Sequence, residues 1–199
     1  MAVFFAELDD LLTEELQIHC CGGFLVINVY DIARTTNDLD FVGTVPNLRG
    51  DLTTIAGQGS PLHRKHGVYL HAVTIATPPE NYQERLLPIH PATWRRLRLF
   101  ALEAHDLALS KLEGNRERDR DDVQRLARAG HLRPDILRER YYRELRPNLT
   151  TSEDKHDLML QLWLDSYWAG LPNLVAEIRH RLLTAHMKHS CDTRIRRLK

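Results

Sequence analysis

Apolar residues in the first 43 positions switch between helical and strand spacing. At the N-terminus they recur every three or four residues, which predicts an amphipathic helix that ends near Gln17. Short apolar runs then predict a buried strand over 18–21, a helix over 24–30 and a second strand over 38–43. This alternation of strand and helix indicates a mixed α/β beginning of the fold.

Glycine and proline dominate the next part of the chain. Five of these residues fall between positions 45 and 66, so we expect a loop there with one helical turn near 52–56. Apolar residues over 67–76 predict a strand, which the following pair of prolines stops. Apolar and basic residues alternate over 94–102, a pattern typical of an edge strand.

From Glu103 onward the apolar spacing is helical. It predicts helices over 106–112, 119–128, 134–145, 152–169 and 172–189. Pro134 and Pro172 near a first turn, and Ser152 before two acidic residues, mark three of the starts. The predicted fold class is therefore α/β (α+β), a mixed sheet with a C-terminal helical half. We expect an α/β domain over 1–102 and a helical domain over 103–199.

The charge balance excludes a global attraction to nucleic acid or membranes, because 27 basic and 27 acidic residues cancel. The segment 179–199 is locally basic; it is interpreted as a solvated helix end that could still steer an RNA strand. Neither a signal peptide nor an apolar stretch of about 20 residues is visible. Three cysteines do not make a disulfide framework, so we expect a cytoplasmic protein without a membrane partner.

The strongest candidate site lies between Cys20 and Val42. Gly22 and Gly23 can turn tightly and leave backbone N–H groups open to a phosphate. Asp38 and Asp40 flank one apolar residue on the predicted strand, where alternate side chains share a face. Two carboxylates opposite a phosphate cradle suit a divalent metal that carries a nucleoside triphosphate. Asp-x-Asp alone is common at solvated loop ends; the glycines and the apolar neighbours favour the metal site.

Two residues just before this strand add a cation and a hydroxyl group to the same edge. Arg34 can bind a phosphate through both arms of its guanidinium group, and Thr36 stands beside it. An ion pair of Arg34 with Asp31 or Asp38 is the alternative interpretation.

A second group of charged residues follows the predicted helix over 106–112. Lys111 is framed by leucines, which predicts a lysine at the core boundary that can hold a triphosphate. Either Asp119 or Asp122 would anchor this lysine or add a metal ligand. If the helix continues through Gly114, Lys111 and Asp122 share one face. If it breaks there, a solvated charged face is the alternative.

Together these motifs resemble the nucleotidyltransferase superfamily, and within it the AbiEii-like toxins of toxin–antitoxin systems and a related bacterial family. The resemblance rests on the glycine pair, Arg-x-Thr-x-Asp-x-Asp, Ser-Lys-Leu and Arg-Asp-x-x-Asp, and covers about residues 15–130. It implies a minimal polymerase-beta-like fold in which Asp38 and Asp40 bind the metal. The residues that would complete the site are Gly22, Gly23, Lys111 and Asp122, with Asp119 competing for the last place.

The same resemblance implies ligands and partners. It implies an NTP and Mg²⁺ as ligands, tRNA or another RNA as the acceptor, and an antitoxin protein as a partner. The sequence therefore predicts a metal-dependent transfer of a nucleotidyl group from an NTP to a hydroxyl group. The alternative is a non-catalytic protein that binds a nucleotide or a partner with a degraded site.

The predicted strand over 67–76 departs from the family pattern. Many nucleotidyltransferases carry a third carboxylate on this strand, whereas its central polar residue here is His71. A histidine can act as a base, but it is a poorer Mg²⁺ ligand than a carboxylate. Either one of the later aspartates supplies the missing charge, or the site is weakened.

Zinc is an alternative chemistry for His19, Cys20, Cys21 and Cys191. These residues lack the C-x-x-C and H-x-x-x-H spacings of zinc sites. Buried, reduced cysteines on a strand are the preferred interpretation.

Overall fold

The computed structural model describes residues 1–32, 36–74, 76–89, 94–149 and 152–168. The chain divides into one unit over Met1–Tyr167 and a second over Trp168–Lys199. The helix predicted over 172–189 lies outside the described residues. The helices up to Tyr167 share the first unit with the sheet. The division into two domains after residue 102 stays a prediction. In the ranges described, no helix combines the length and apolar character that crossing a membrane requires.

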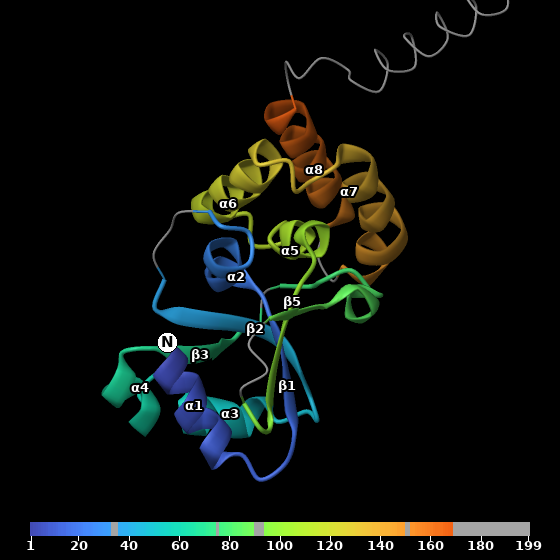
Figure 1. The fold of residues 1–199 in the computed structure, drawn as a ribbon. Coiled ribbons are helices and arrows are strands. Elements are labelled where there is room, and N and C mark those ends of the chain that lie inside the picture. The colour runs from blue at the N-terminus through green and yellow to red at the C-terminus, as the bar shows by residue number, and fades with distance from the viewer. Residues whose placement is uncertain (33–35, 75, 90–93, 150–151, 169–199) are drawn as a thin grey trace, which may run out of the picture. The chain divides into compact units, whose positions relative to one another are not determined.

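A five-stranded mixed sheet runs through the first unit in the order β3-β2-β1-β5-β4 (Figure 1). β1 (Leu16–Cys20) pairs antiparallel with β2 (Asp38–Val45) and parallel with β5 (Leu97–Ala101). β2 pairs parallel with β3 (Tyr69–Ala72), and β4 (Leu87–Ile89) pairs antiparallel with β5. The predicted α/β (α+β) fold class is confirmed. The prediction that 94–102 forms an edge strand is wrong, because β4 covers that side.

The sheet separates two groups of helices. α1 (Ala2–Leu11), α3 (Arg49–Ala56) and α4 (Pro61–His66) lie on one side of it. α2 (Gly22–Asn28) lies on the other side with the later helices (Figure 1). The first helix ends at Leu11 rather than near Gln17, because the backbone from Leu16 onward already pairs with the sheet.

The helical turn predicted near 52–56 lies in α3, but the loop predicted for the rest of 45–66 is wrong, since α3 is longer and α4 follows it. Gly57 caps the end of α3, and Pro61 is the first residue of α4. Ser60 accepts a hydrogen bond from the His63 backbone N–H at 3.1 Å, and Pro61 follows in the first turn. Gly67, with φ of +67°, ends α4 in the left-handed conformation.

A buried carboxylate joins α1 to the start of β5. Asp9 accepts backbone hydrogen bonds from Arg95, Arg96 and Leu97 at 2.7–2.8 Å. Burial opposes ionisation of this carboxyl, but the three N–H groups outweigh it and lower its pKa. The first helix is therefore fixed to the sheet by a polar anchor as well as by its apolar face.

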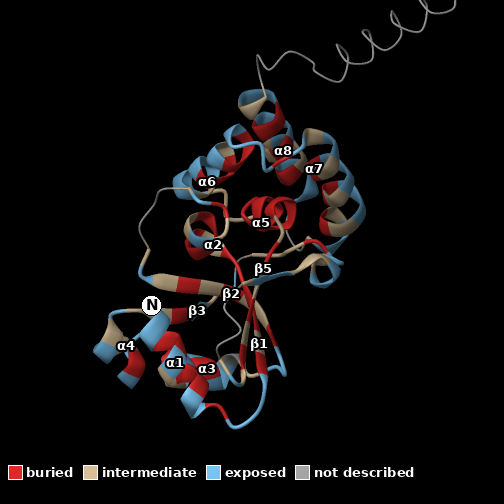
Figure 2. Cartoon of the chain, in the orientation of Figure 1, coloured by how far each residue is buried: buried red, intermediate tan, exposed pale blue. Residues whose placement is uncertain are grey.

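The later helices surround one fully buried helix. All seven residues of α5 (Ala104–Ser110) are buried, and α5 lies at the centre of this group (Figure 2). α6 (Glu117–Arg128), α7 (Pro134–Arg140) and α8 (Glu153–Tyr167) follow it. The predicted helix over 134–145 becomes a π-helix, η2 (Tyr141–Leu145), in its last five residues. A short 3-10 helix, η3 (Arg146–Asn148), follows.

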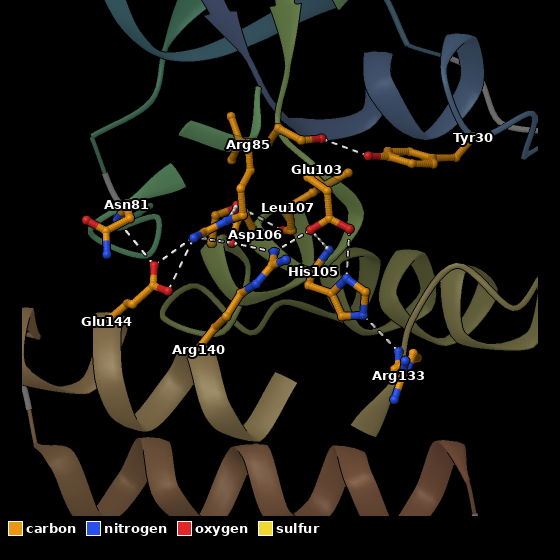
Figure 3. Close-up of polar contacts among 12 residues, drawn as sticks. Tyr30, Asn81, Arg85, Glu103, His105, Asp106, Leu107, Arg133, Arg140 and Glu144 are labelled. Carbon is orange, nitrogen blue, oxygen red and sulfur yellow. Dashed lines mark hydrogen bonds and ion pairs between the residues drawn. The ribbon is translucent and has the colours of Figure 1, made fainter. Parts of the chain in front are cut away.

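A group of ion pairs connects α5 with its neighbours (Figure 3). Asp106, which is 0% exposed, accepts hydrogen bonds from Arg85 Nε at 2.8 Å and from Arg140 Nη1 at 3.0 Å. Arg85 ends the 3-10 helix η1 (Tyr82–Arg85) and also pairs with Glu144 of η2 at 2.6 Å. Because a buried charge is tolerated only with partners, this cluster fixes η1, α5, α7 and η2 to one another.

Glu103 belongs to the same cluster and begins α5. Its carboxylate accepts a hydrogen bond from His105 Nδ1 at 2.8 Å and pairs with Arg140. His105 Nε2 accepts from the Arg133 backbone N–H, so the proton of this imidazole belongs on Nδ1. Burial raises the pKa of Glu103, but the bonds from His105 and Arg140 outweigh it and hold the pKa at about 2.

We expect Glu103 to contribute to acid sensitivity. Its pKa in the folded protein lies below the ordinary 4.5, so its ionised form stabilises the fold above pH 4.5. That contribution is lost as the pH falls from 4.5 toward 2. Glu103→Gln should lower the free energy of unfolding at pH 7 by about 1–3 kcal/mol, and should flatten its fall in this acid range.

Urea unfolding at a series of pH values measures both effects. Glu139→Gln is the matched control, because Glu139 forms an exposed pair with Arg143. It should leave the acid slope unchanged. Parallel acid slopes for wild type and Glu103→Gln would contradict the role given to Glu103.

Candidate active site

The carboxylates of Asp38 and Asp40 share one face of β2. Both side chains are half-buried, whereas Leu39 and Phe41, which alternate with them, are fully buried. This is the arrangement that the Asp-x-Asp spacing predicts for a strand. Thr36 donates a hydrogen bond to Asp38 Oδ1 from just before the strand. Arg34 lies outside the described residues, so its predicted phosphate contact stays a prediction.

His71 joins the two aspartates from the neighbouring strand. The parallel register of β2 and β3 sets His71 opposite Asp40, and the two side chains lie 2.8 Å apart from Nδ1 to Oδ1. One possible ligand atom from each of Asp38, Asp40 and His71 lies within 4.8 Å of the others. Three ligand atoms at this spacing can surround a single cation.

Burial and the nearby charge of Asp38 both oppose ionisation of the Asp40 carboxyl. Burial raises the pKa of its carboxyl, the hydrogen bond with His71 opposes the rise, and the negative charge of Asp38 adds to it. The net direction is upward. A cation between the two carboxylates would remove the repulsion and favour the ionised form.

The glycine pair lies beside the same carboxylate. Gly22 has a φ of +69°, and a Cβ built there would lie 2.7 Å from Asp40 Cβ and Cγ, and closer still to Oδ2. The Cys21 backbone N–H also donates to the Asp40 carbonyl oxygen at 2.8 Å. The structure therefore brings α2, with Gly22 and Gly23 as its first residues, directly against the edge that carries Asp38 and Asp40. Phosphate binding by the glycines stays a prediction.

Two adjoining cavities open at this edge, with volumes of about 250 and 390 Å³. Both are lined by Asp40, His71, Lys111, Arg116 and Asp119. The smaller cavity also reaches Gly22, and the larger one reaches Thr36 and Asp38. Residues from the sheet and from the helical half therefore face one space, large enough for part of a nucleotide.

Lys111 lines both cavities, as its leucine neighbours predict, but its ammonium group is already paired. It is 8% exposed, and Nζ lies 3.0 Å from Asp122 Oδ2 and 3.2 Å from Asp119 Oδ1. Of the two alternatives at Gly114, the structure shows the break, because α5 ends at Ser110 and α6 begins at Glu117. The lysine nevertheless reaches both aspartates across the break.

The two aspartates have different positions. Asp122 is 3% exposed and lies behind Lys111, outside the lining of either cavity. Asp119 lines both cavities and also accepts a hydrogen bond from the Arg116 backbone N–H at 3.1 Å. The structure thus brings Asp119 rather than Asp122 to the site. A catalytic role for Asp122 stays a prediction, and its observed contact is with the lysine.

Sequence reasoning did not select Arg116 and Arg118 as site residues. Both are exposed and line the larger cavity, so they add positive charge opposite the carboxylates. The signal was the Arg-Glu-Arg run over 116–118, where α6 begins. It could not be interpreted without the turn at Asn115, which has a φ of +40° and redirects the chain.

The cysteines near the site support the non-zinc interpretation. Cys20 and Cys21 are buried cysteines that form no disulfide in the described part of the chain, and burial raises the pKa of Cys20. A raised pKa disfavours the thiolate that zinc requires. His19 instead contacts the Tyr82 hydroxyl at 3.1 Å. Cys191 lies outside the described residues.

A family model described as "Nucleotidyltransferase of unknown function (DUF6036)" matches residues 2–167. Neither a curated protein nor a solved structure matches the sequence. The matched range contains all residues that line the two cavities. The match supports the superfamily that the motifs resemble, while the resemblance to AbiEii-like toxins stays a prediction.

The contact between Gly22 and Asp40 can be tested with a matched glycine. Gly22 and Gly67 have φ of +69° and +67°, so alanine at either position adopts the strained left-handed conformation. At Gly67 nothing lies within 4 Å of the added Cβ, whereas at Gly22 it collides with Asp40. We expect Gly22→Ala to lower the free energy of unfolding by about 1–3 kcal/mol more than Gly67→Ala.

Urea unfolding of the two variants makes this comparison. The double variant Gly22→Ala with Asp40→Ala should recover part of the loss, because the carboxylate is gone while its Cβ remains. Equal losses for the two glycine variants would show that position 22 does not depend on Asp40.

Proposed function

Since the chain belongs to this family of nucleotidyltransferases, we propose that it is an enzyme that transfers a nucleotidyl group from an NTP to an acceptor hydroxyl group. The proposed enzyme acts in the cytoplasm. It uses a divalent cation such as Mg²⁺, bound at Asp38 and Asp40. The observation that carries the proposal is the convergence of Asp38, Asp40 and His71 on cavities that also contain Lys111 and Arg116. Negative ligands for a cation and positive groups for phosphates thus face one space.

The residues present fit a divalent cation. Two carboxylate oxygens and an imidazole nitrogen are ordinary ligands of such ions, and the crowding of charge around Asp40 favours one there. When bound, the cation would supply charge stabilisation at the α-phosphate and at the leaving pyrophosphate. Holding the carboxylates on one rigid strand keeps this position fixed before substrate arrives.

The reaction itself needs little covalent chemistry from the protein. The acceptor oxygen forms a bond with the α-phosphorus, the bond from that phosphorus to the bridging oxygen breaks, and pyrophosphate leaves with the bonding electrons. The hydroxyl proton passes to a base or to water. Asp119, which lines both cavities, is the carboxylate that we propose orients the hydroxyl group.

The triphosphate would lie against the cationic side of the cavities. Lys111 shares its charge with Asp119 and Asp122, so it is already neutralised. Arg116 and Arg118 are exposed, and they would therefore supply more of the attraction for phosphate oxygens. The main role of Lys111 would then be to hold the two aspartates in place.

The acceptor and the biological role are proposed from the motif resemblance. We propose RNA, in particular tRNA, as the acceptor and an AbiEii-like role as a toxin with an antitoxin partner. The basic composition of residues 179–199 supports an RNA acceptor electrostatically.

A second candidate function is favoured by one observation. His71 occupies the strand position where a third carboxylate is expected, which fits a non-catalytic protein that binds a nucleotide or a partner. A transfer assay separates the two candidates, because both allow nucleotide binding.

We expect the whole chain to transfer label from one of the four α-labelled NTPs to total tRNA when a divalent cation is present. Asp40→Asn should reduce the rate by about 10²–10³-fold, since it removes charge but little volume. Asp51→Asn is the control, because Asp51 is exposed on α3 across the sheet. Nucleotide binding without transfer to any RNA by the wild type would support the non-catalytic candidate.

Arg118→Gln tests the placement of the triphosphate. We expect a KM for the NTP about tenfold higher, with kcat nearly unchanged, because a ground-state phosphate contact is lost. Arg128→Gln, an exposed arginine at the end of the same helix, should leave both constants unchanged. Equal effects of the two substitutions on KM would remove Arg118 from the phosphate site.

A further inference from the structure

The candidate cation site has a mixed set of ligand atoms. Two of its groups are carboxylates on β2, and the third is the imidazole of His71 on β3, which is one of the two edge strands of the sheet. The His71 side chain is 57% exposed and lines both cavities. A histidine that served only packing would be buried, whereas this one is open to a ligand.

The backbone fixes the imidazole close to the carboxylates. Asp40 and His71 are register partners in a parallel pair, so their side chains emerge on the same face of the sheet. Their separation of 2.8 Å shows that the ring already points toward the carboxylate edge. Little rearrangement is needed for a ring nitrogen to share a cation with Asp38 and Asp40.

The chemistry of an imidazole ligand discriminates between divalent ions. Mg²⁺ prefers oxygen ligands and keeps several waters, and nitrogen is a poor replacement for a carboxylate in its shell. Mn²⁺ accepts carboxylate oxygens equally well and, as a transition metal, also binds imidazole. It keeps the open positions that phosphate oxygens need. A site with two carboxylates and one histidine therefore favours Mn²⁺ over Mg²⁺.

We propose that His71 is the third ligand of the cation and that it makes this site bind Mn²⁺ more tightly than Mg²⁺. The inference rests on the proposed function, because it concerns the cation of that same site. Binding needs the neutral imidazole. If Nε2 binds, the Nδ1–H hydrogen bond to Asp40 orients the ring; if Nδ1 binds, its proton moves to Nε2 and the cation replaces that bond.

The test measures metal binding rather than activity. The full chain is stripped with a chelator and titrated with Mn²⁺ by electron paramagnetic resonance, and Mg²⁺ affinity is obtained by competition. Pulsed measurements of the Mn²⁺ complex detect a coordinated imidazole through its ¹⁴N coupling. We expect this coupling in the wild type and in His131→Ala, which removes an exposed histidine elsewhere.

Two substitutions at position 71 test whether His71 is a ligand of the cation or only lies near it. His71→Ala should abolish the ¹⁴N coupling and weaken Mn²⁺ binding by about tenfold or more, with a smaller change for Mg²⁺. His71→Asp should also abolish the coupling but should strengthen Mg²⁺ relative to Mn²⁺, because it restores a third carboxylate. His71→Ala is expected to keep the fold, since His71 is exposed, and its melting temperature checks this. His71→Asp places a third carboxylate beside Asp38 and Asp40, so its melting temperature should fall without a cation and recover when one binds.

The outcomes distinguish this inference from the proposed function. Two results would overturn the role of His71 and leave the proposed function standing. One is Mn²⁺ binding without ¹⁴N coupling. The other is a preference for Mn²⁺ over Mg²⁺ that is the same in wild type and His71→Ala. Equal failure of the wild type and of Asp40→Asn to bind any divalent cation overturns both.

Discussion

The close approach of α2 to Asp40 is the constraint on which the site depends. Position 22 has no room for a Cβ atom, and the backbone before it donates a hydrogen bond to the Asp40 carbonyl. This contact fixes where the chain leaves β1 relative to β2. The parallel register of β2 and β3 in turn places His71 beside Asp40. Asp40 therefore connects the glycine turn and the histidine to the strand that carries both carboxylates.

The other side of the cavities is set by charge rather than by close packing. Asp106 has no exposure to solvent, and Arg85 and Arg140 neutralise it from two neighbouring elements. Breaking such a pair leaves an uncompensated charge, which typically costs several kcal/mol. The cluster thus holds α5 rigidly, and Lys111 follows directly after α5. The lysine and the arginines that come next are positioned at the cavities through this fixed helix.

Local patterns were sufficient for the residues whose geometry is local. The period of a strand gave the common face of Asp38 and Asp40, and the strand position of His71 identified the departure from a third carboxylate. Predictions failed where the structure of a segment depends on contacts with residues far away in the sequence. β4 covers β5 through long-range pairing, and the segment 45–66 contains two helices, α3 and α4, instead of a loop. Asp119 and Asp122 have the same chemistry and both lie on α6, and only the packing of this helix decides which of them faces the cavities.

In the proposed enzyme, the cavity at Asp38 and Asp40 holds the cation and the triphosphate of an NTP. A crystal structure of the full chain with Mn²⁺ and a non-hydrolysable NTP tests it most directly, because anomalous scattering locates the metal independently of the nucleotide. We predict one Mn²⁺ bound by Asp38, Asp40 and His71, with the phosphates between it and Arg116 and Arg118. A nucleotide bound elsewhere, or a cation that does not touch Asp38 and Asp40, would contradict the account.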